Sequence, residues 1–207
     1  MSQTQFSSPT SIQDAIQSLA SSTGTTKVLA GGTDLLVQLR AGMISPDHIV
    51  DLKRIPALKA ISEENGGFRI GAAVAGAELS EHKDIPNVWP GVVEGLDLIG
   101  STQIQGRASL GGNLCNGSPA ADSVPAMIAA GATCKIVGPD GEREAKVEDI
   151  VVGPGRTSLA NNEFVVSFFL PQRPSRSCDA YLRLMPRTEM DIDVVGPGVR
   201  LRLDAVG

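Results

Sequence analysis

Apolar positions in the first 55 residues recur with two different periods, which predicts alternating helices and strands. Four apolar residues near the N-terminus share helical spacing: Ile12, Ala15, Ile16 and Leu19. Thr10 precedes this run and Gln13 lies three residues after it, so the two are placed to form a capping box. The sequence therefore predicts a first helix with Thr10 as its N-cap.

A strand, a glycine turn, a second helix and a second strand are predicted next. Lys27–Ala30 is a short, mainly apolar run that leads directly into Gly31-Gly32. Helical spacing begins again at Leu35, and His48–Leu52 is a second short apolar run. Helix, strand, glycine turn, helix and strand together make a predicted α/β unit.

A second unit is predicted to begin after Pro56. Leu58–Ile61 and Phe68–Val74 have the pattern of strands, and Asn65-Gly66-Gly67 between them is typical of a tight hairpin turn. The apolar stripe of a helix follows, made of Val88, Val92, Leu96 and Ile99.

Ser101–Pro119 shows neither the helical nor the strand period and is rich in glycine, serine and asparagine. We therefore expect a long loop there, and long loops inside compact domains are usually functional. Asp122–Pro125 then opens a short helix, and Gly131 is placed to end it.

A hairpin around the turn at residues 138–141 and the strongly apolar strand Phe164–Leu170 complete the second unit. The pattern predicts a mixed fold, α+β built from α/β units. Its expected parts are an N-terminal subdomain at residues 1–56, a second subdomain at 57–176 and the beginning of a further domain at 177–207.

Composition narrows the function classes. Glycine makes up 23 of 207 residues, about 11% against an average near 7%, whereas aromatic residues make up only 3%. The formal charge of -5 and scattered basic residues argue against a nucleic-acid partner. No apolar run reaches the length of a membrane span, and Met1–Pro9 lacks a basic-then-apolar signal pattern. We expect a cytoplasmic protein.

Side chains that commonly perform catalysis are scarce. The three cysteines (Cys115, Cys134 and Cys178) form no C-x-x-C pair, and His48 and His82 are the only histidines. We predict no metal site and no catalytic acid, base or nucleophile, and we interpret these five residues as structural. The glycines remain the unusual feature.

The first glycine motif lies where a strand is predicted to lead into a helix. It consists of eight consecutive residues: Val28, Leu29, Ala30, Gly31, Gly32, Thr33, Asp34 and Leu35. Glycine there lets the backbone turn sharply and approach a ligand, while N–H groups at the helix start bind an anion. The alternative is a purely structural turn with Asp34 as an ordinary first-turn acid.

The second glycine motif lies about 80 residues further on. It consists of Ser109, Leu110, Gly111, Gly112 and Asn113, and Asp122 follows nine residues later. Its backbone amides are also placed to approach a phosphate, with Asp122 holding a ligand hydroxyl; in the structural alternative, Asp122 or Ser123 caps a helix. Two such motifs on two units are what a long dinucleotide between them requires.

These segments resemble the FAD-binding subunit of the molybdenum hydroxylases, the family of carbon monoxide, aldehyde, nicotinate and xanthine dehydrogenases. The family's A-G-G-T/H-x-L pattern is similar to Ala30–Leu35, and its T/S-[IVL]-G-G-N pattern, followed by Asp, is similar to Ser109–Asn113 and Asp122. Ser118–Ala126 is also typical, and the resemblance extends over residues 5–204.

The resemblance implies a PCMH-type FAD-binding fold, in which two α/β subdomains clasp an extended FAD. It implies that the two motifs surround the pyrophosphate and that Asp122 binds a cofactor hydroxyl. Ile99 and Gly100 would lie near the flavin or adenine ring, and Val165 would contact the cofactor through its backbone. Arg183 occupies the place of a flavin-contacting lysine found in xanthine dehydrogenase.

The implied activity is electron transfer by an oxidoreductase subunit, with the flavin carrying the chemistry. Expected partners are a molybdopterin-containing large subunit and an iron–sulfur small subunit, in a dimer of heterotrimers. The alternatives are a self-contained flavin oxidoreductase and a truncated structural subunit without flavin. Residues 177–207 are too few for a complete domain, so we expect 181–207 to pack poorly in the isolated chain.

Overall fold

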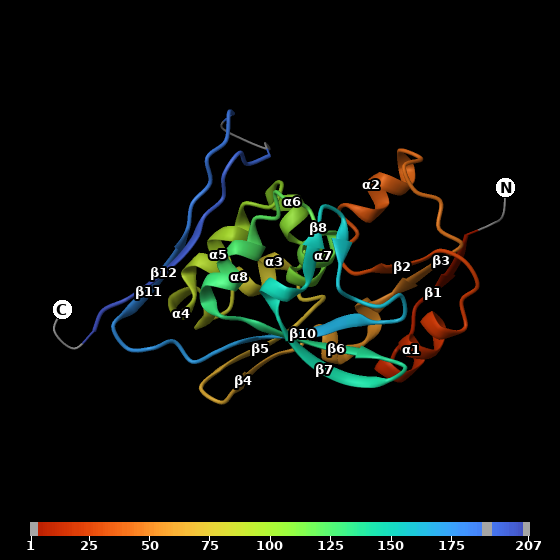
Figure 1. Ribbon diagram of the computed structural model, residues 1–207, viewed down its shortest axis with the longest axis horizontal. Helices are drawn as coiled ribbons and strands as arrows, with labels where there is room; N and C mark the ends of the chain where they lie inside the picture. Colours follow the sequence, from red (N-terminus) through yellow and green to blue (C-terminus); the bar gives the residue numbers. More distant parts are fainter. Residues whose placement is uncertain (1–3, 188–191, 205–207) are drawn as a thin grey trace.

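A computed structural model describes residues 4–187 and 192–204. The N-terminal unit is a three-stranded sheet, in the order β1-β3-β2, whose strands are all parallel. Two short helices connect the strands (Figure 1). The elements are β1 (Gln5–Ser7), α1 (Ile12–Ala20), β2 (Thr26–Leu29), α2 (Leu35–Arg40) and β3 (His48–Asp51). The sequence pattern predicted all of these except β1.

The N-cap of α1 differs from the prediction by one residue. Ser11, not Thr10, has the extended backbone of a cap, and its hydroxyl accepts a hydrogen bond from the Asp14 N–H at 3.1 Å. The predicted box with Gln13 was therefore wrong, because a serine directly beside the first helical turn takes the capping position.

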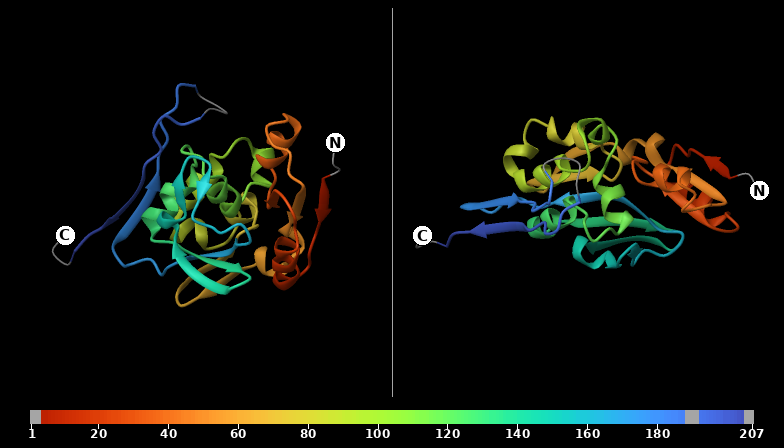
Figure 2. Two further views of the ribbon diagram at one scale, coloured as in Figure 1. Left: turned by 45° about the vertical axis from the view of Figure 1, so that its right-hand side comes forward. Right: turned by 90° about the horizontal axis from the view of Figure 1, so that it is seen from above.

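The main body is a five-stranded antiparallel sheet in the order β4-β5-β10-β6-β7, with helices layered over one of its faces (Figures 1 and 2). The strands are β4 (Ile61–Glu64), β5 (Gly67–Gly71), β6 (Thr133–Gly138), β7 (Gly141–Lys146) and β10 (Phe164–Leu170). The helices are α3 (Gly76–Ser80), α4 (Ile85–Val88), α5 (Pro90–Asp97), α6 (Thr102–Gln105), α7 (Leu110–Asn116) and α8 (Ser123–Ala130). A small ribbon of β8 (Val151–Gly153) and β9 (Arg156–Thr157) lies beside α7. Short 3-10 turns occupy Leu52–Arg54, Pro56–Leu58 and Val147–Asp149.

Two apolar cores hold these layers together. The larger lies between the main sheet and its helices and includes Trp89, Met127 and Phe168, each fully buried. The smaller joins α1 and β3 to β10 and includes Leu19 and Phe164. Because this second core contains residues from both sides of Pro56, the two predicted subdomains pack directly on each other.

Four predicted elements differ in the structure, and one of them differs only at its end, since the strand predicted at Phe68–Val74 ends at Gly71. Ser101–Pro119 is not a loop, since α6 and α7 occupy much of it. The predicted helix through Val88 and Ile99 is two helices, because Trp89 precedes a proline and leaves the helical conformation, with φ -131° and ψ 63°. The strand predicted at Leu58–Ile61 begins only at Ile61, since the preceding residues form a 3-10 turn.

The last described part of the chain is a hairpin of β11 (Ser177–Tyr181) and β12 (Gly198–Arg202), which leans against α5 and α8 and projects from one end of the molecule (Figure 2). Its inner face buries Asp179 and Tyr181. Its outer face is apolar and exposed, with Leu201 at 61%. The expectation that 181–207 packs poorly in isolation stays a prediction; residues 188–191 and 205–207 lie outside the described chain.

Candidate functional site

A cavity of about 710 Å³ lies between the N-terminal unit, the helical layer and the first residues of β10. Fifteen of the eighteen residues assigned to a cofactor from the sequence line it: Val28, Ala30, Gly31, Gly32, Thr33, Asp34, Leu35, Ile99, Gly100, Ser109, Gly111, Gly112, Asn113, Asp122 and Val165. The other three do not line it. Leu29 and Leu110 are buried in the protein, and Arg183 lies behind Asp122.

The two glycine motifs meet at this cavity. A Cβ atom added to Gly31 would lie 1.9 Å from the carbonyl oxygen of Arg107, two residues before the second motif begins. No side chain fits in that contact, because real Cβ atoms stay more than 3 Å from such atoms. Gly31 therefore lets the N-terminal unit touch the segment that leads into α7.

The first motif is a turn with unused backbone donors. Gly32 has φ +79°, a conformation that favours glycine. Between described residues, no hydrogen bond uses the N–H groups of Gly32, Thr33 or Asp34. The carbonyl of the preceding Ala30 is fixed by the ammonium of Lys53 at 2.9 Å. This turn can present several N–H groups to an anion in the cavity.

The side chain of Asp34 takes no part in capping α2. It accepts a hydrogen bond from Gln38, one turn along the same helix. Both residues line the cavity, so this carboxylate is held at its wall by a local contact. The purely structural interpretation of Asp34 therefore accounts for its side-chain contact with Gln38. The backbone N–H groups of the turn remain available to a ligand.

The second motif is the start of a helix. Ser109 is the N-cap of α7, and its hydroxyl accepts a hydrogen bond from the Gly112 N–H at 3.2 Å. The Gly111 N–H donates to the Ala72 carbonyl at 3.2 Å, and a Cβ on Gly111 would lie 2.5 Å from that oxygen. Gly111 is therefore required for packing. A Cβ on Gly112 would meet only the Ser109 hydroxyl, at 3.3 Å.

Asn113 connects the second motif to the helix that follows it. Its side-chain oxygen accepts hydrogen bonds from both the N–H of Ser123, at 3.2 Å, and the hydroxyl of Ser123, at 2.7 Å. The α8 start is thus fastened to α7 at the cavity wall. The amide nitrogen of Asn113 is left as the group that can donate to a ligand.

Asp122 lies immediately before α8, but its carboxylate does not cap that helix. Its Oδ1 accepts a hydrogen bond from the Tyr181 hydroxyl at 3.0 Å and one from Arg183 Nη1 at 3.3 Å. Burial raises the pKa of the Asp122 carboxyl, while the hydrogen bond from Tyr181 and the charge of Arg183 oppose that rise. The helix-capping alternative is wrong for this side chain.

The sequence did not identify several residues of the cavity wall. They include Lys27, Gln38, Ala72, Ile104, Cys115, Asn161 and Glu163. Glu163 is held by Arg143 through two hydrogen bonds of 2.8 Å and by the Ala160 N–H at 2.9 Å. No local sequence signal marks these residues, because only the folded chain brings them to the cavity.

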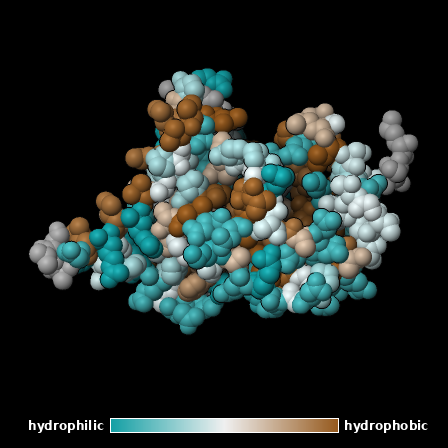
Figure 3. Space-filling view, viewed as in Figure 1, coloured by the Kyte–Doolittle hydropathy of each residue, from teal (hydrophilic) through white to brown (hydrophobic). Residues whose placement is uncertain are grey.

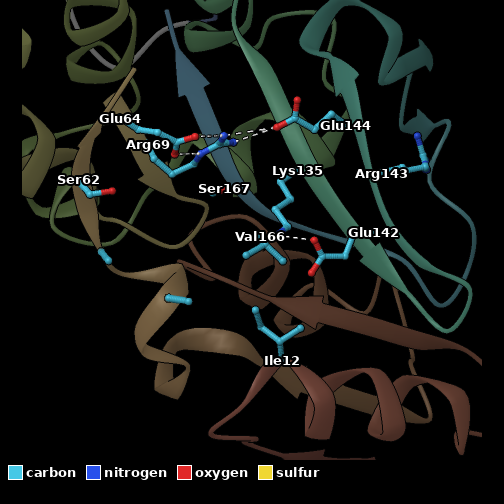
Figure 4. Close-up of a pocket in the computed structure, with 12 residues that line it drawn as sticks. Ile12, Ser62, Glu64, Arg69, Lys135, Glu142, Arg143, Glu144, Val166 and Ser167 are labelled. Atoms are coloured by element: carbon cyan, nitrogen blue, oxygen red, sulfur yellow. Dashed lines mark hydrogen bonds and ion pairs between the residues drawn. The ribbon is translucent and has the colours of Figure 1, made fainter. Parts of the chain in front are cut away.

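A second groove, of about 600 Å³, lies on the face of the main sheet opposite α3–α8, beside α1 and the 3-10 turn at Pro56–Leu58. Figure 4 shows the Arg69 guanidinium between the carboxylates of Glu64 and Glu144, and Lys135 against Glu142. These opposite charges neutralise one another along the groove. The glycine-lined cavity therefore offers the better site for an anionic ligand.

Within residues 4–187 and 192–204, no group of three His, Cys, Asp or Glu side chains is placed to hold a metal ion. No helix in the same residues is long and apolar enough to cross a membrane.

Fold and cavity together define a cofactor-binding domain, in which two glycine motifs from separate units line one cleft. The chain belongs to the family described as the FAD binding domain in molybdopterin dehydrogenase, whose pattern matches residues 2–173. The family resemblance, the mixed α/β fold and FAD as the cofactor of the family are confirmed.

Named relatives agree with this assignment. The xanthine dehydrogenase FAD-binding subunit of Escherichia coli O157:H7 is 34% identical over 93% of this chain and 66% of its own length. The carbon monoxide dehydrogenase medium chain of Hydrogenophaga pseudoflava is 29% identical over 89% of this chain and 64% of its own. The chain thus spans slightly less than two thirds of the length of these relatives.

Solved structures show the same fold. Carbon monoxide dehydrogenase from Hydrogenophaga pseudoflava superposes with a TM-score of 0.93 at 28% identity, covering 98% of this chain and 70% of that one. Quinoline 2-oxidoreductase from Pseudomonas putida 86 gives 0.86 at 26% identity, covering 94% and 67%.

Proposed function

We propose that this chain is the FAD-binding, electron-transferring subunit of a molybdenum hydroxylase. In this role it passes electrons from iron–sulfur clusters on a partner subunit, through FAD, to an external acceptor. Relatives named as FAD-binding subunits and medium chains of dehydrogenases support the proposal.

The observation that carries the proposal is the meeting of both glycine motifs at one cavity. The contact between Gly31 and the Arg107 carbonyl leaves no room for a side chain, and the neighbouring turn has unused N–H donors. A volume of about 710 Å³ lies within the range of about 300–1,000 Å³ typical of ligand and cofactor sites. The residues present therefore fit a long anionic cofactor such as FAD.

When bound, FAD supplies the redox chemistry, and this chain supplies orientation and electrostatics. Under this proposal the N–H groups of Gly32 and Thr33, which no described hydrogen bond uses, would donate to the pyrophosphate. Asp122 would accept a hydrogen bond from a cofactor hydroxyl, and Ile99 and Val165, which line the cavity, would lie around the rings. None of these roles requires an acid or base from the chain, in agreement with the lack of a catalytic cluster expected from its sequence.

The partners are part of the same proposal. They are a molybdopterin-containing large subunit and an iron–sulfur small subunit, assembled as a dimer of heterotrimers, and the cytoplasmic location stays a prediction.

Apolar side chains gather at the end of the β11–β12 hairpin, in the upper left of Figure 3. The most exposed are Leu182, Leu184, Ile192 and Val194. We propose that this exposed apolar surface is part of the further domain expected from residue 177 onward.

The test is a fluorescence titration of the purified chain with FAD, comparing two matched glycine variants. Gly112→Val places a side chain in the cavity wall without meeting backbone, whereas Gly106→Val lies away from the cavity, with only the Gln103 carbonyl at 3.7 Å from its Cβ. We expect Gly112→Val to weaken FAD binding about tenfold or more, since backbone approach is blocked. Gly106→Val should bind as the wild type does.

Failure of the wild-type chain to bind FAD would overturn the proposal and leave the structural-subunit alternative. Equal affinity in both variants would overturn the assignment of FAD to this cavity. Substrate-dependent reduction of the bound flavin without any partner subunit would instead support the self-contained oxidoreductase.

A further inference from the structure

The hairpin that follows the FAD-binding family segment reaches back to the cavity wall. Its two contributing side chains, Tyr181 and Arg183, are both buried and both bind Asp122 Oδ1. The family match ends at residue 173, so these side chains come from outside it. Arg183 does not line the cavity, so it is not positioned to contact a ligand there directly.

The Asp122 carboxylate has one oxygen occupied and one available. Oδ1 accepts from both Tyr181 and Arg183, and no other described side chain donates to this carboxylate. No described group donates a hydrogen bond to Oδ2, and Oδ2 is not one of the buried polar atoms without a partner. It is therefore accessible at the cavity that Asp122 lines. The arrangement holds the carboxylate from behind and leaves Oδ2 to accept from a ligand hydroxyl.

Helix α5 sets the distance between Asp122 and the hairpin. A Cβ on Gly95 would lie 2.7 Å from the Asp122 carbonyl oxygen, so α5 touches the backbone at this residue. The Glu94 carboxylate accepts from the Tyr181 N–H at 2.8 Å. On the same helix, the Gly91 N–H donates to Asp179 Oδ2 at 2.8 Å. Both partners of the contact are therefore fixed to one rigid element.

Arg183 joins Asp122 to a second part of the wall. Its Nη1 also donates to the carbonyl of Leu98 at 3.0 Å, directly before Ile99 and Gly100. One guanidinium nitrogen thus holds both the carboxylate and the segment that lines the cavity beside it. Arg183 Nε is buried with no hydrogen-bond partner, a costly state that persists because the rest of the guanidinium is held in place.

We propose that Tyr181 and Arg183 are positioning residues of the cofactor site, which aim the Asp122 carboxylate at a hydroxyl of the bound FAD. This inference rests on the proposed function. It replaces the expected direct contact between Arg183 and the flavin with an indirect action through Asp122 and Leu98.

The experiment is a double-mutant cycle on FAD affinity, measured by fluorescence titration of the 207-residue chain. Tyr181→Phe removes only the hydroxyl, and Asp122→Asn removes the charge of its acceptor. We expect each to raise the Kd for FAD about fivefold to tenfold, and the double variant to be no weaker than Asp122→Asn alone. Non-additivity of this kind distinguishes action through Asp122 from a general loss of stability.

A matched pair of arginine variants controls for the anchoring of the hairpin. Arg200 also lies on the hairpin and donates to a helix carbonyl, that of Ala130 at 3.1 Å, but it does not contact Asp122. Arg183→Lys should raise the Kd for FAD several-fold, and Arg200→Lys should leave it unchanged although both variants lose an anchoring contact. Melting of each variant without FAD measures the structural part separately.

The outcomes separate this inference from the proposed function. A wild-type chain that does not bind FAD overturns both. Normal FAD binding by the wild type, Tyr181→Phe and Arg183→Lys overturns the positioning role alone. Additive effects of Tyr181→Phe and Asp122→Asn also overturn it, because they show that the hydroxyl acts independently of the carboxylate.

Discussion

The two glycine motifs look alike in the sequence and differ in the structure. In the first, Gly31 allows contact between two units, and Gly32 turns the backbone at φ +79°, which leaves N–H groups unused. In the second, Gly111 packs a helix against Ala72 and its N–H is already bonded. The glycine pair therefore indicates close backbone approach in both places. Among the described residues, only the first motif keeps several backbone N–H groups without an acceptor.

The largest effect should follow from adding a methyl group at the contact between the units. Gly31→Ala places a Cβ 1.9 Å from a backbone oxygen, so the contact has to open. We expect a loss of unfolding free energy of about 3 kcal/mol or more, as for severe overpacking. Urea denaturation of wild type and Gly31→Ala measures it, and a change below about 1 kcal/mol would show that this contact is not rigid.

Gly111→Ala tests the packing role of the second motif. Its Cβ would lie 2.5 Å from the Ala72 oxygen and 2.9 Å from the Ala72 Cβ, a less severe overlap than at Gly31. We expect a loss of about 1–3 kcal/mol in the free energy of unfolding, measured by the same denaturation. A loss equal to or greater than that of Gly31→Ala would reverse the order of the two contacts.

Removal of the cap on α7 should have a smaller effect. Ser109→Ala deletes the hydroxyl that accepts from the Gly112 N–H, which costs about 1 kcal/mol at a typical N-cap. Ser11→Ala, at the cap of α1 and away from the cavity, is the matched control. We expect similar losses of stability from both but weaker FAD binding only in Ser109→Ala; equal FAD affinity would show that the α7 start does not shape the site.

The smallest effect should be a dependence of FAD affinity on pH. It distinguishes the two motifs because the second is followed by a titrating group, the Asp122 carboxyl. Backbone amides of the first motif do not titrate, whereas the Asp122 carboxyl does, with its pKa raised above that of a free aspartate by burial. FAD affinity should fall a few-fold as the pH drops through that raised pKa, because the protonated carboxyl loses its acceptor charge. An Asp122→Asn variant should show no such dependence, and an identical pH profile would assign the titration elsewhere.

The same shift has the opposite sign for the stability of the chain without FAD. A folded-state pKa above the unfolded one means that the folded chain binds the proton more tightly. This contribution to stability is fully present below the unfolded pKa and is lost as the pH rises through the folded pKa. The contribution of Asp122 to the melting temperature, taken as the difference between wild type and Asp122→Asn, should therefore move in the opposite direction to the FAD affinity over this pH range.

Local patterns predicted much of the fold. The strand Phe164–Leu170, the hairpin turn at Asn65-Gly66 and the Gly131 helix end were all predicted from short-range signals. Helix α7 was missed because two glycines in seven residues oppose helix formation. Packing against Ala72 and the Ser109 cap stabilise it instead.

The site could be predicted only in part. Glycine pairs in sequence marked both sides of the cavity, and fifteen of the eighteen assigned residues line it. The contacts that decide how each residue acts are long-range. Gly31 meets Arg107 and Asp122 meets Tyr181, 76 and 59 positions away respectively, and no local pattern records such pairings.

The most direct test of the difference between the motifs is hydrogen exchange of the chain with and without FAD. Peptides covering residues 31–35 and 110–114 report the two sets of N–H groups separately. We predict that FAD strongly slows exchange at Gly32, Thr33 and Asp34 and changes little at Gly111, whose N–H is already bonded to Ala72. Saturating FAD that leaves exchange at residues 32–34 unchanged would contradict the account.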